Sequence, residues 1–144
     1  MKKNKVFEIF KPNKSAIKEL PLYSDLISAG FPSPAEDYLD KKLDLNEYLI
    51  KNRPATFLVK VNGNSMINSG IYDGDILVVD RSVEPANKKI VIGVIDGEFT
   101  VKRIIKKTKK LFLQPENENF KPIEITEDMD FKIWGIVTFA IHKY

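Results

Sequence analysis

Alternation of apolar and polar residues dominates the chain from Ala55 onward and predicts a mainly β protein. Runs rich in β-branched and aromatic residues recur there, separated by short turn segments. The strands expected from this pattern are 55–61, 75–80, 89–95, 98–105, 110–114 and 131–142. No internal repeat or low-complexity segment interrupts them.

The Asp96-Gly97 dipeptide between two of these runs is a strong signal for a two-residue β-hairpin turn. Such a turn pairs the residues on either side of it and therefore places Lys102 opposite Val91. One face of the hairpin is then largely apolar, whereas the face that carries Lys102 mixes apolar and polar side chains. We therefore expect Lys102 to be partly desolvated and still accessible.

The last run, 131–142, is apolar on both faces of the expected strand. A strand with two apolar faces is either central in its sheet or covered by a partner. We expect a homodimer that uses part of this run, because an uncovered edge strand of this kind would aggregate.

Residues 1–30 contain few apolar residues and no sustained period, so they predict an arm that is ordered only in part. Two capping signals follow, Ser33-Pro34-Ala35-Glu36 and Asp44-Leu45-Asn46-Glu47, and they predict two short helices between Pro34 and Ile50. The expected organisation is an N-terminal arm, 1–29, followed by a β domain, 30–144.

Composition and charge are those of one globular domain. The chain has 144 residues, of which 43% are hydrophobic and 30% charged, and its formal net charge is +3. Residues 1–30 hold six lysines against three acidic residues, so the remainder is neutral and lacks the electrostatic footprint of strong nucleic-acid binding. No signal peptide and no apolar stretch long enough to cross a bilayer is present, which favours a cytoplasmic protein. With one histidine and no cysteine, a zinc site is disfavoured and no cofactor is expected.

Ser65 and Lys102 are the candidate catalytic residues. A serine hydroxyl needs a base to remove its proton, and the single histidine, His142, lies near the C-terminus and is interpreted as a surface residue. A buried, neutral lysine can serve as that base. If Ser65-Met66-Ile67 opens a helical turn, the backbone N–H groups of Ser65 and Met66 are candidates for an oxyanion site. The alternative for Ser65 is a helix N-cap without a catalytic role.

Four stretches together resemble the LexA/UmuD family of self-cleaving Ser-Lys peptidases, and within it the UmuD branch. They are Gly30-Phe31-Pro32-Ser33-Pro34-Ala35, Gly63-Asn64-Ser65-Met66-Ile67, Asp73-Gly74-Asp75 and Asp96-Gly97-Glu98-Phe99-Thr100-Val101-Lys102. The resemblance runs from about Pro21 to the C-terminus.

This resemblance implies Ser65 as nucleophile, Lys102 as general base and self-cleavage between Ala29 and Gly30. It also implies a twisted, barrel-like β domain of the LexA C-terminal type, with short N-terminal helices and a flexible arm. Cleavage would be stimulated by a filament of RecA on single-stranded DNA. The processed homodimer would then act as an accessory subunit of an error-prone, UmuC-like translesion DNA polymerase in the SOS response to DNA damage.

Other functions remain open at this point. A signal peptidase shares the Ser-Met and Gly-Asp pattern, but the lack of a membrane anchor argues against it. A repressor-type autopeptidase would regulate transcription, yet only 29 residues precede Gly30, too few for a helix-turn-helix domain, so direct sequence-specific DNA binding is not expected. A polymerase-binding module without catalysis is a third alternative.

Two further motifs have competing interpretations. The run Leu20-Pro21-Leu22-Tyr23 could dock on a sliding clamp or on the polymerase, although packing on the domain is favoured because exposed apolar patches are usually avoided. The basic run Lys106–Lys110 is interpreted as a solvated hairpin loop rather than a phosphate contact.

Overall fold

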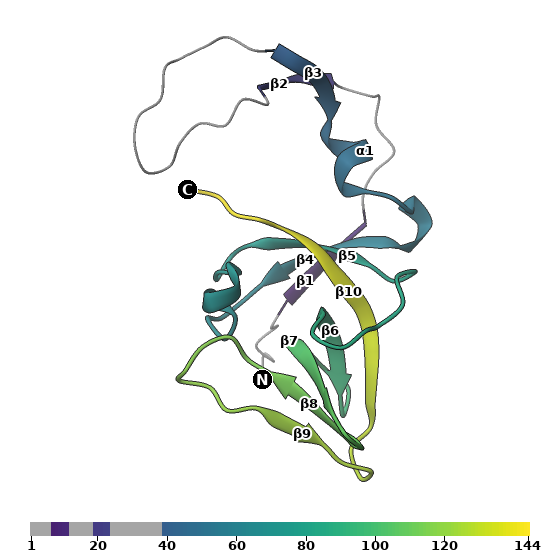
Figure 1. The fold of residues 1–144 in the computed structure, drawn as a ribbon, viewed down its shortest axis with the longest axis vertical. Coiled ribbons are helices and arrows are strands. Elements are labelled where there is room, and N and C mark those ends of the chain that lie inside the picture. Colours follow the sequence, from purple (N-terminus) through teal and green to yellow (C-terminus); the bar gives the residue numbers. More distant parts are fainter. Residues whose placement is uncertain (1–6, 12–18, 24–38) are drawn as a thin grey trace, which may run out of the picture. The chain divides into compact units, whose positions relative to one another are not determined.

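The computed structural model describes residues 7–11, 19–23 and 39–144 (Figure 1). Contacts between residues divide the chain into two compact units, Met1–Pro12 with Asn52–Tyr144, and Asn13–Lys51. The boundary predicted between residues 29 and 30 lies outside the described residues, so the division into arm and domain stays a prediction.

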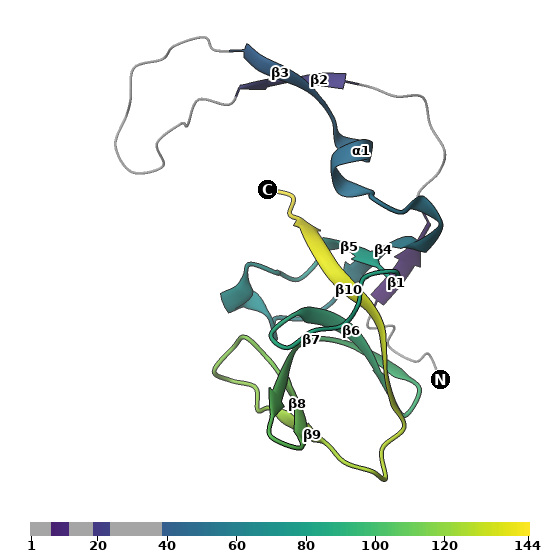
Figure 2. The same cartoon turned by 45° about the vertical axis from the view of Figure 1, so that its right-hand side comes forward.

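The larger unit is built on one antiparallel sheet of eight strands in the order β1-β4-β5-β10-β6-β7-β8-β9. The strands are β1 (Phe7–Phe10), β4 (Thr56–Val61), β5 (Ile76–Asp80), β6 (Ile90–Ile95), β7 (Glu98–Lys107), β8 (Lys110–Gln114), β9 (Ile123–Ile125) and β10 (Phe131–Ile141). The sheet curls strongly (Figure 2), yet it begins at β1 and ends at β9 and is therefore not a closed barrel. The prediction of a mainly β fold is confirmed.

The β6–β7 hairpin has the predicted register. Ile95 lies opposite Glu98, and Val91 lies opposite Lys102. The turn residues Asp96 and Gly97 have φ values of 48° and 84°. A turn with both central residues in the left-handed region matches the twist of the strands that it joins, which explains why Asp-Gly occurs here.

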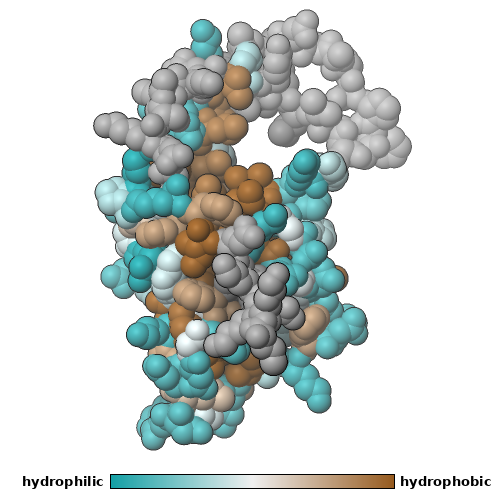
Figure 3. Space-filling model, turned by 180° about the vertical axis from the view of Figure 1, so that it is seen from behind, coloured by the Kyte–Doolittle hydropathy of each residue, from teal (hydrophilic) through white to brown (hydrophobic). Residues whose placement is uncertain are grey.

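Apolar side chains fill both faces of the curled sheet. The larger cluster is formed by Val59, Val61, Met66, Ile71, Leu77, Val79, Ile92 and Val101. A smaller one is formed by Val91, Ile104 and Ile136. Neighbouring residues of the β6–β7 hairpin thus contribute to different clusters, because successive side chains of a strand point to opposite faces. Other apolar side chains stay on the surface, and Figure 3 shows a run of apolar surface on one face of the molecule.

Strand β10 lies in the middle of the sheet, between β5 and β6. Its position explains the two apolar faces of its sequence, since Trp134 and Val137 pack against the larger cluster and Ile133 against the smaller one. A β-carbon added at Gly135 would lie 2.5 Å from a Val79 methyl group, so this position requires the absence of a side chain. Of the two interpretations of the sequence, a central strand is the one observed.

The smaller unit contains β2 (Glu19–Tyr23), β3 (Leu39–Asp44) and the short helix α1 (Leu45–Leu49). The second expected helix is confirmed as α1, and the Asp44 carboxylate accepts a hydrogen bond from the Asn46 N–H at 2.8 Å. The first expected helix is wrong for residues 39–44, which pair with β2 as a strand. The predicted cap at Ser33 and Glu36 lies outside the described residues.

Two minor interpretations can also be compared with the structure. The basic run around Thr108 is an exposed turn of the β7–β8 hairpin, as predicted. The run from Leu20 to Tyr23 lies in β2 of the smaller unit and pairs with β3, and its favoured packing on the domain stays a prediction.

Candidate active site

Ser65 follows β4 in a connecting segment whose shape is fixed by its neighbours. The Gly63 N–H donates to the Asp73 carboxylate at 2.7 Å, which joins the two ends of this segment. Met66 is 1% exposed and belongs to the larger apolar cluster. Ser65 itself is half-buried, so the buried neighbour holds the backbone while the hydroxyl stays accessible.

Lys102 projects from β7 on the face opposite the buried Val101, and its amine lies beside the Ser65 hydroxyl. The Lys102 Nζ atom is 2.9 Å from Ser65 Oγ, 3.0 Å from Thr100 Oγ1 and 3.0 Å from the Val101 carbonyl oxygen. Thr100 and Lys102 are neighbours on one face because they are two residues apart on a strand. The structure therefore brings the two predicted residues, 37 positions apart, into hydrogen-bond contact.

The Lys102 amine donates to three oxygen atoms, Ser65 Oγ, Thr100 Oγ1 and the Val101 carbonyl oxygen, which satisfies the three donors of a charged ammonium. A neutral amine has two N–H donors and one lone pair. In that form Lys102 would keep its bonds to Thr100 and Val101 and offer the lone pair to the Ser65 hydroxyl proton. Within the described part of the chain, no carboxylate forms an ion pair with Lys102 that would favour its charged form.

Burial lowers the pKa of Lys102 below its ordinary value. The physical cause is desolvation, which disfavours the charged ammonium more than the neutral amine. A lysine in this environment can accept a proton at a lower pH than a lysine in water, which is the property that a general base needs.

The predicted oxyanion site lies at the start of a turn that begins later than expected. The 3-10 turn η2 spans Ile67–Ser69, and Met66 precedes it as the N-cap. The Met66 carbonyl oxygen accepts hydrogen bonds from the Ser69 N–H at 3.0 Å and the Ser69 hydroxyl at 2.7 Å. Among the described residues, no acceptor is assigned to the N–H of Ser65 or Met66, and their role in an oxyanion site stays a prediction.

The predicted cleavage bond between Ala29 and Gly30 lies outside the described residues. Its position relative to Ser65 therefore stays a prediction.

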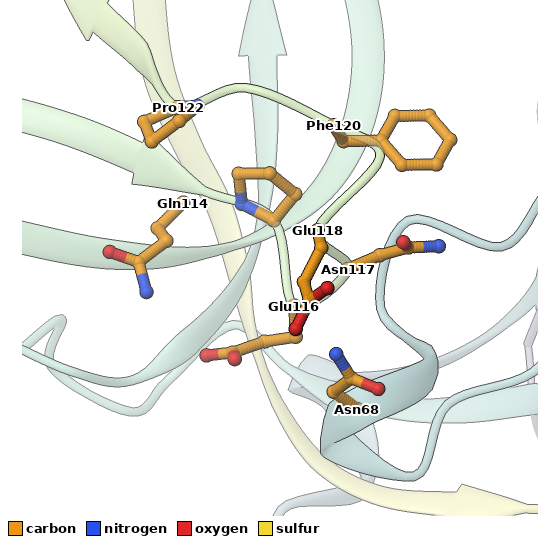
Figure 4. A pocket seen from close by; sticks show the side chains of 8 residues that line it. Asn68, Gln114, Glu116, Asn117, Glu118, Phe120 and Pro122 are labelled. Carbon is orange, nitrogen blue, oxygen red and sulfur yellow. The ribbon is translucent and has the colours of Figure 1, made fainter.

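A segment that the sequence analysis did not single out lies next to the Ser65 segment. It follows β8 and lines a pocket of about 280 Å³. Figure 4 shows Asn68, from η2, on the side of the pocket that faces Glu116 and Glu118. The contacts of this segment with Asn64 and Asn68 involve mainly backbone atoms, and such contacts leave no recognisable residue pattern.

His142 is exposed, as predicted, and it also contacts a buried side chain. Its ring Nδ1 contacts Asp75, which is 2% exposed, and the other Asp75 oxygen accepts from the Tyr72 N–H at 2.8 Å. The ring also lies 5.0 Å from that of Tyr72. This contact joins His142, which follows β10, to the segment between η2 and β5.

Over 7–11, 19–23 and 39–144, no three His, Cys, Asp or Glu side chains are grouped to hold a metal ion. None of the helices in the same ranges is long and apolar enough to span a bilayer. The predicted cytoplasmic location stays a prediction.

Known proteins are similar to this chain over most of its length. Residues 21–138 match the family described as Peptidase S24-like. Protein MucA of Salmonella typhimurium is 41% identical over 131 residues, which cover 90% of this chain and 89% of MucA. Protein SamA of the same species is 45% identical over 123 residues, which cover 85% of each chain. LexA repressor 1 of Xanthomonas oryzae pv. oryzae is 38% identical over 130 residues, 90% of this chain and 64% of the repressor.

Proposed function

Because the chain belongs to the peptidase S24-like family of LexA/UmuD-type serine peptidases, we propose that it cuts its own backbone between Ala29 and Gly30. The resemblance inferred from the sequence motifs is confirmed by this membership and by the UmuD-like relatives. The observation that carries the proposed chemistry is the 2.9 Å contact between Ser65 Oγ and Lys102 Nζ.

In the proposed reaction, neutral Lys102 takes the hydroxyl proton of Ser65 as the oxygen attacks the carbonyl carbon of Ala29. The backbone N–H groups of Ser65 and Met66 donate to the oxyanion that forms. The Lys102 ammonium then gives its proton to the nitrogen of Gly30 as the peptide bond breaks, leaving residues 1–29 as an ester on Ser65. Water activated by Lys102 hydrolyses that ester and restores both side chains.

The direct test is the intact mass of purified protein, incubated alone and with RecA, single-stranded DNA and an ATP analogue. We expect a product that begins at Gly30, formed faster with the filament. Ser65→Ala and Lys102→Ala should each abolish the product, because the two side chains act as one unit. A cut elsewhere, or normal cutting in Ser65→Ala, would overturn the assignment.

We further propose that the processed protein is a homodimer and serves a UmuC-like translesion polymerase in the SOS response. The UmuD-like relatives support the cellular role. The dimer is supported by β10, which pairs with β6 only over Phe131–Ile136 and with β5 over Ile136–Ile141. The end of β10 also carries an exposed apolar side chain, Ile141, which a second copy could cover.

A repressor-type function is the second candidate, because one relative is named a LexA repressor. The two functions differ in what the cut controls. A chain beginning at Gly30 should restore damage-induced mutagenesis in cells that lack the native protein if it serves a polymerase, and uncut Ser65→Ala should not. If both chains restore mutagenesis equally, or neither does, the polymerase function is wrong. Cleavage-dependent transcription without an effect on mutagenesis would favour the repressor.

A further inference from the structure

Strand β1 covers the outer edge of β4, and it belongs to the part of the chain that precedes the proposed cleavage bond. Phe7 lies opposite Val61, and Phe10 lies opposite Leu58. The other edge of β4 is paired with β5. On its outer edge, the backbone N–H and C=O groups of β4 therefore find their hydrogen-bond partners in β1.

The contacts at this edge continue beyond the strand itself. The Lys11 amine donates to the Pro54 carbonyl oxygen at 3.2 Å and lies 4.8 Å from the centre of the Phe57 ring. With β1 in place, Val59 and Val61 on β4 are only 1% and 5% exposed. Loss of β1 would thus free both a row of backbone hydrogen-bonding groups and the apolar surface beside it.

We propose that self-cleavage converts the outer edge of β4 into a docking site for an extended strand of a partner protein. The inference rests on the proposed function, because the Ala29–Gly30 bond is the covalent link that keeps β1 on the same chain as β4. A short tethered segment has an effective concentration on the order of 1 mM, so release into a solution of about 1 μM lowers its local concentration by about 10³-fold. A four-residue strand then competes poorly with a partner strand.

The same cut also separates β2 from β3, because residues 29 and 30 lie between these two strands. The severed segment 1–29 therefore retains two strand pairings and does not leave as soon as the bond is broken. A partner strand that takes the β4 edge removes one of these pairings and speeds the departure of the segment.

The register defines the chemistry of the strand that fits. Positions opposite Val59 and Val61 share the face of the buried apolar cluster, so apolar side chains fit there. The position opposite the exposed Lys60 suits an acidic side chain, and the position opposite the half-buried Leu58 suits an apolar one. The expected partner segment thus reads apolar, acidic, apolar, apolar, the pattern of Phe7-Glu8-Ile9-Phe10, and binds by strand addition.

The experiment uses the full chain with Ser65→Ala and a recognition sequence for a specific protease inserted between Ala29 and Gly30. The cut then does not depend on the peptidase chemistry, so a failure of self-cleavage does not affect this result. The probe is a fluorescent synthetic peptide with the sequence of residues 5–12. After the cut and removal of the arm by gel filtration, we expect the peptide to bind at least tenfold more tightly than to the uncut chain, and the β4 amides to exchange hydrogen faster without it.

Two control peptides separate strand addition from apolar adhesion. N-methylation of alternate backbone amides should abolish binding, and Glu8→Lys in the peptide should weaken it severalfold because a lysine then lies opposite Lys60. If the cut chain precipitates, Ile9→Asp in the uncut chain provides the same test, since it weakens β1 without any cut. Val83→Asp, at a similarly exposed residue in the β5–β6 connection, is its control.

Equal binding by cut and uncut chains, or unchanged hydrogen exchange in β4 after arm removal, would overturn the proposal. The proposal would also be overturned if the cut chain formed a larger oligomer that does not bind the peptide. That result would assign the β4 edge to a second copy of the chain. Faster β4 exchange and peptide binding in Ile9→Asp but not in Val83→Asp would support it.

Discussion

The backbone N–H of Glu116 donates a hydrogen bond to the carbonyl oxygen of Ser65 at 2.8 Å. The Glu116 carbonyl oxygen accepts one from the Asn68 N–H, also at 2.8 Å, so this residue is joined to the Ser65 segment on both sides. Its carboxylate forms an ion pair with Arg103, the residue that follows Lys102 on β7. Glu116 therefore links the segment that carries the proposed nucleophile to the strand that carries the proposed base.

We predict that Glu116→Ala slows self-cleavage about tenfold, because small displacements of reacting groups have large effects on rate. The reason is that the loss of the Arg103 ion pair weakens the link between the Ser65 segment and the strand that carries Lys102. Rates would be measured by intact mass at alkaline pH. Glu124→Ala, which removes the exposed partner of Lys110 from the neighbouring strand, is the matched control and should cleave normally. Equal rates in the two variants would refute the linking role.

Thr100→Val should also slow cleavage by about three- to tenfold, since a neutral hydrogen bond contributes about 1 kcal/mol. The Thr100 hydroxyl accepts from the Lys102 amine at 3.0 Å, and its loss frees the amine to rotate away from Ser65. Thr138→Val, which removes a hydroxyl bound to the Val78 carbonyl oxygen, is the control. The prediction fails if both valine variants cleave at the rate of the parent chain.

Cleavage without a partner should accelerate as pH rises and level off below the ordinary lysine pKa of ~10.4. Burial lowers the pKa of Lys102, so the neutral base forms in the folded protein at a lower pH than it would in water. As the pH falls through that lowered pKa, Lys102 becomes protonated and the fraction of protein with a neutral base is lost. A rate that is flat from neutral to alkaline pH would argue against lysine as the base.

Gly135→Ala should destabilise the fold by about 1–3 kcal/mol, the usual cost of overpacking. A β-carbon at this position would lie 2.5 Å from a Val79 methyl group and 3.2 Å from the Arg81 side chain. Gly93→Ala is the comparison, because there the nearest atom is 3.0 Å away in the Phe131 ring. Urea unfolding should show a larger decrease in the free energy of unfolding for Gly135→Ala than for Gly93→Ala. The reverse order would contradict the packing argument.

The proposed dimer makes a prediction about the end of β10. Ile141 is 44% exposed and lies where β10 has β5 on one side only. Ile141→Asp should shift sedimentation toward the monomer at micromolar concentration, whereas Val83→Asp at a similarly exposed loop position should not. A parent chain that sediments as a monomer would rule out the dimer itself.

Local signals in the sequence were sufficient for much of the sheet. All six expected strands are present, and Asp96-Gly97 alone determined the register that places Lys102 opposite Val91. The pattern missed β1, β2, β3 and β9. Strand β2 contains Pro21, and four of the six residues of β3 are charged, so neither has the apolar pattern of a typical strand. Residues 39–44 lie in the range in which two short helices were expected, but they form a strand that pairs with β2.

The geometry of the candidate site could be predicted from the sequence only in part. Family motifs pointed to Ser65 and Lys102, yet their proximity could not be calculated from any hairpin, because β4 and β7 are separated by three other strands. The position of Thr100 beside Lys102 did follow from strand alternation. The link through Glu116 could not be foreseen, because it uses backbone atoms of a segment without regular structure.

The central place of β10 in the sheet determines when the folding chain becomes able to cleave itself. Among the described strands, β4 and β5, next to Ser65, are joined in the sheet to β6 and β7, the strand of Lys102, through β10, which follows all four in the sequence. Until that strand is inserted, no ladder of hydrogen bonds holds the two halves together. A chain that lacks β10 should therefore be inert, and the ability to cut shows that β10 has taken its place in the sheet.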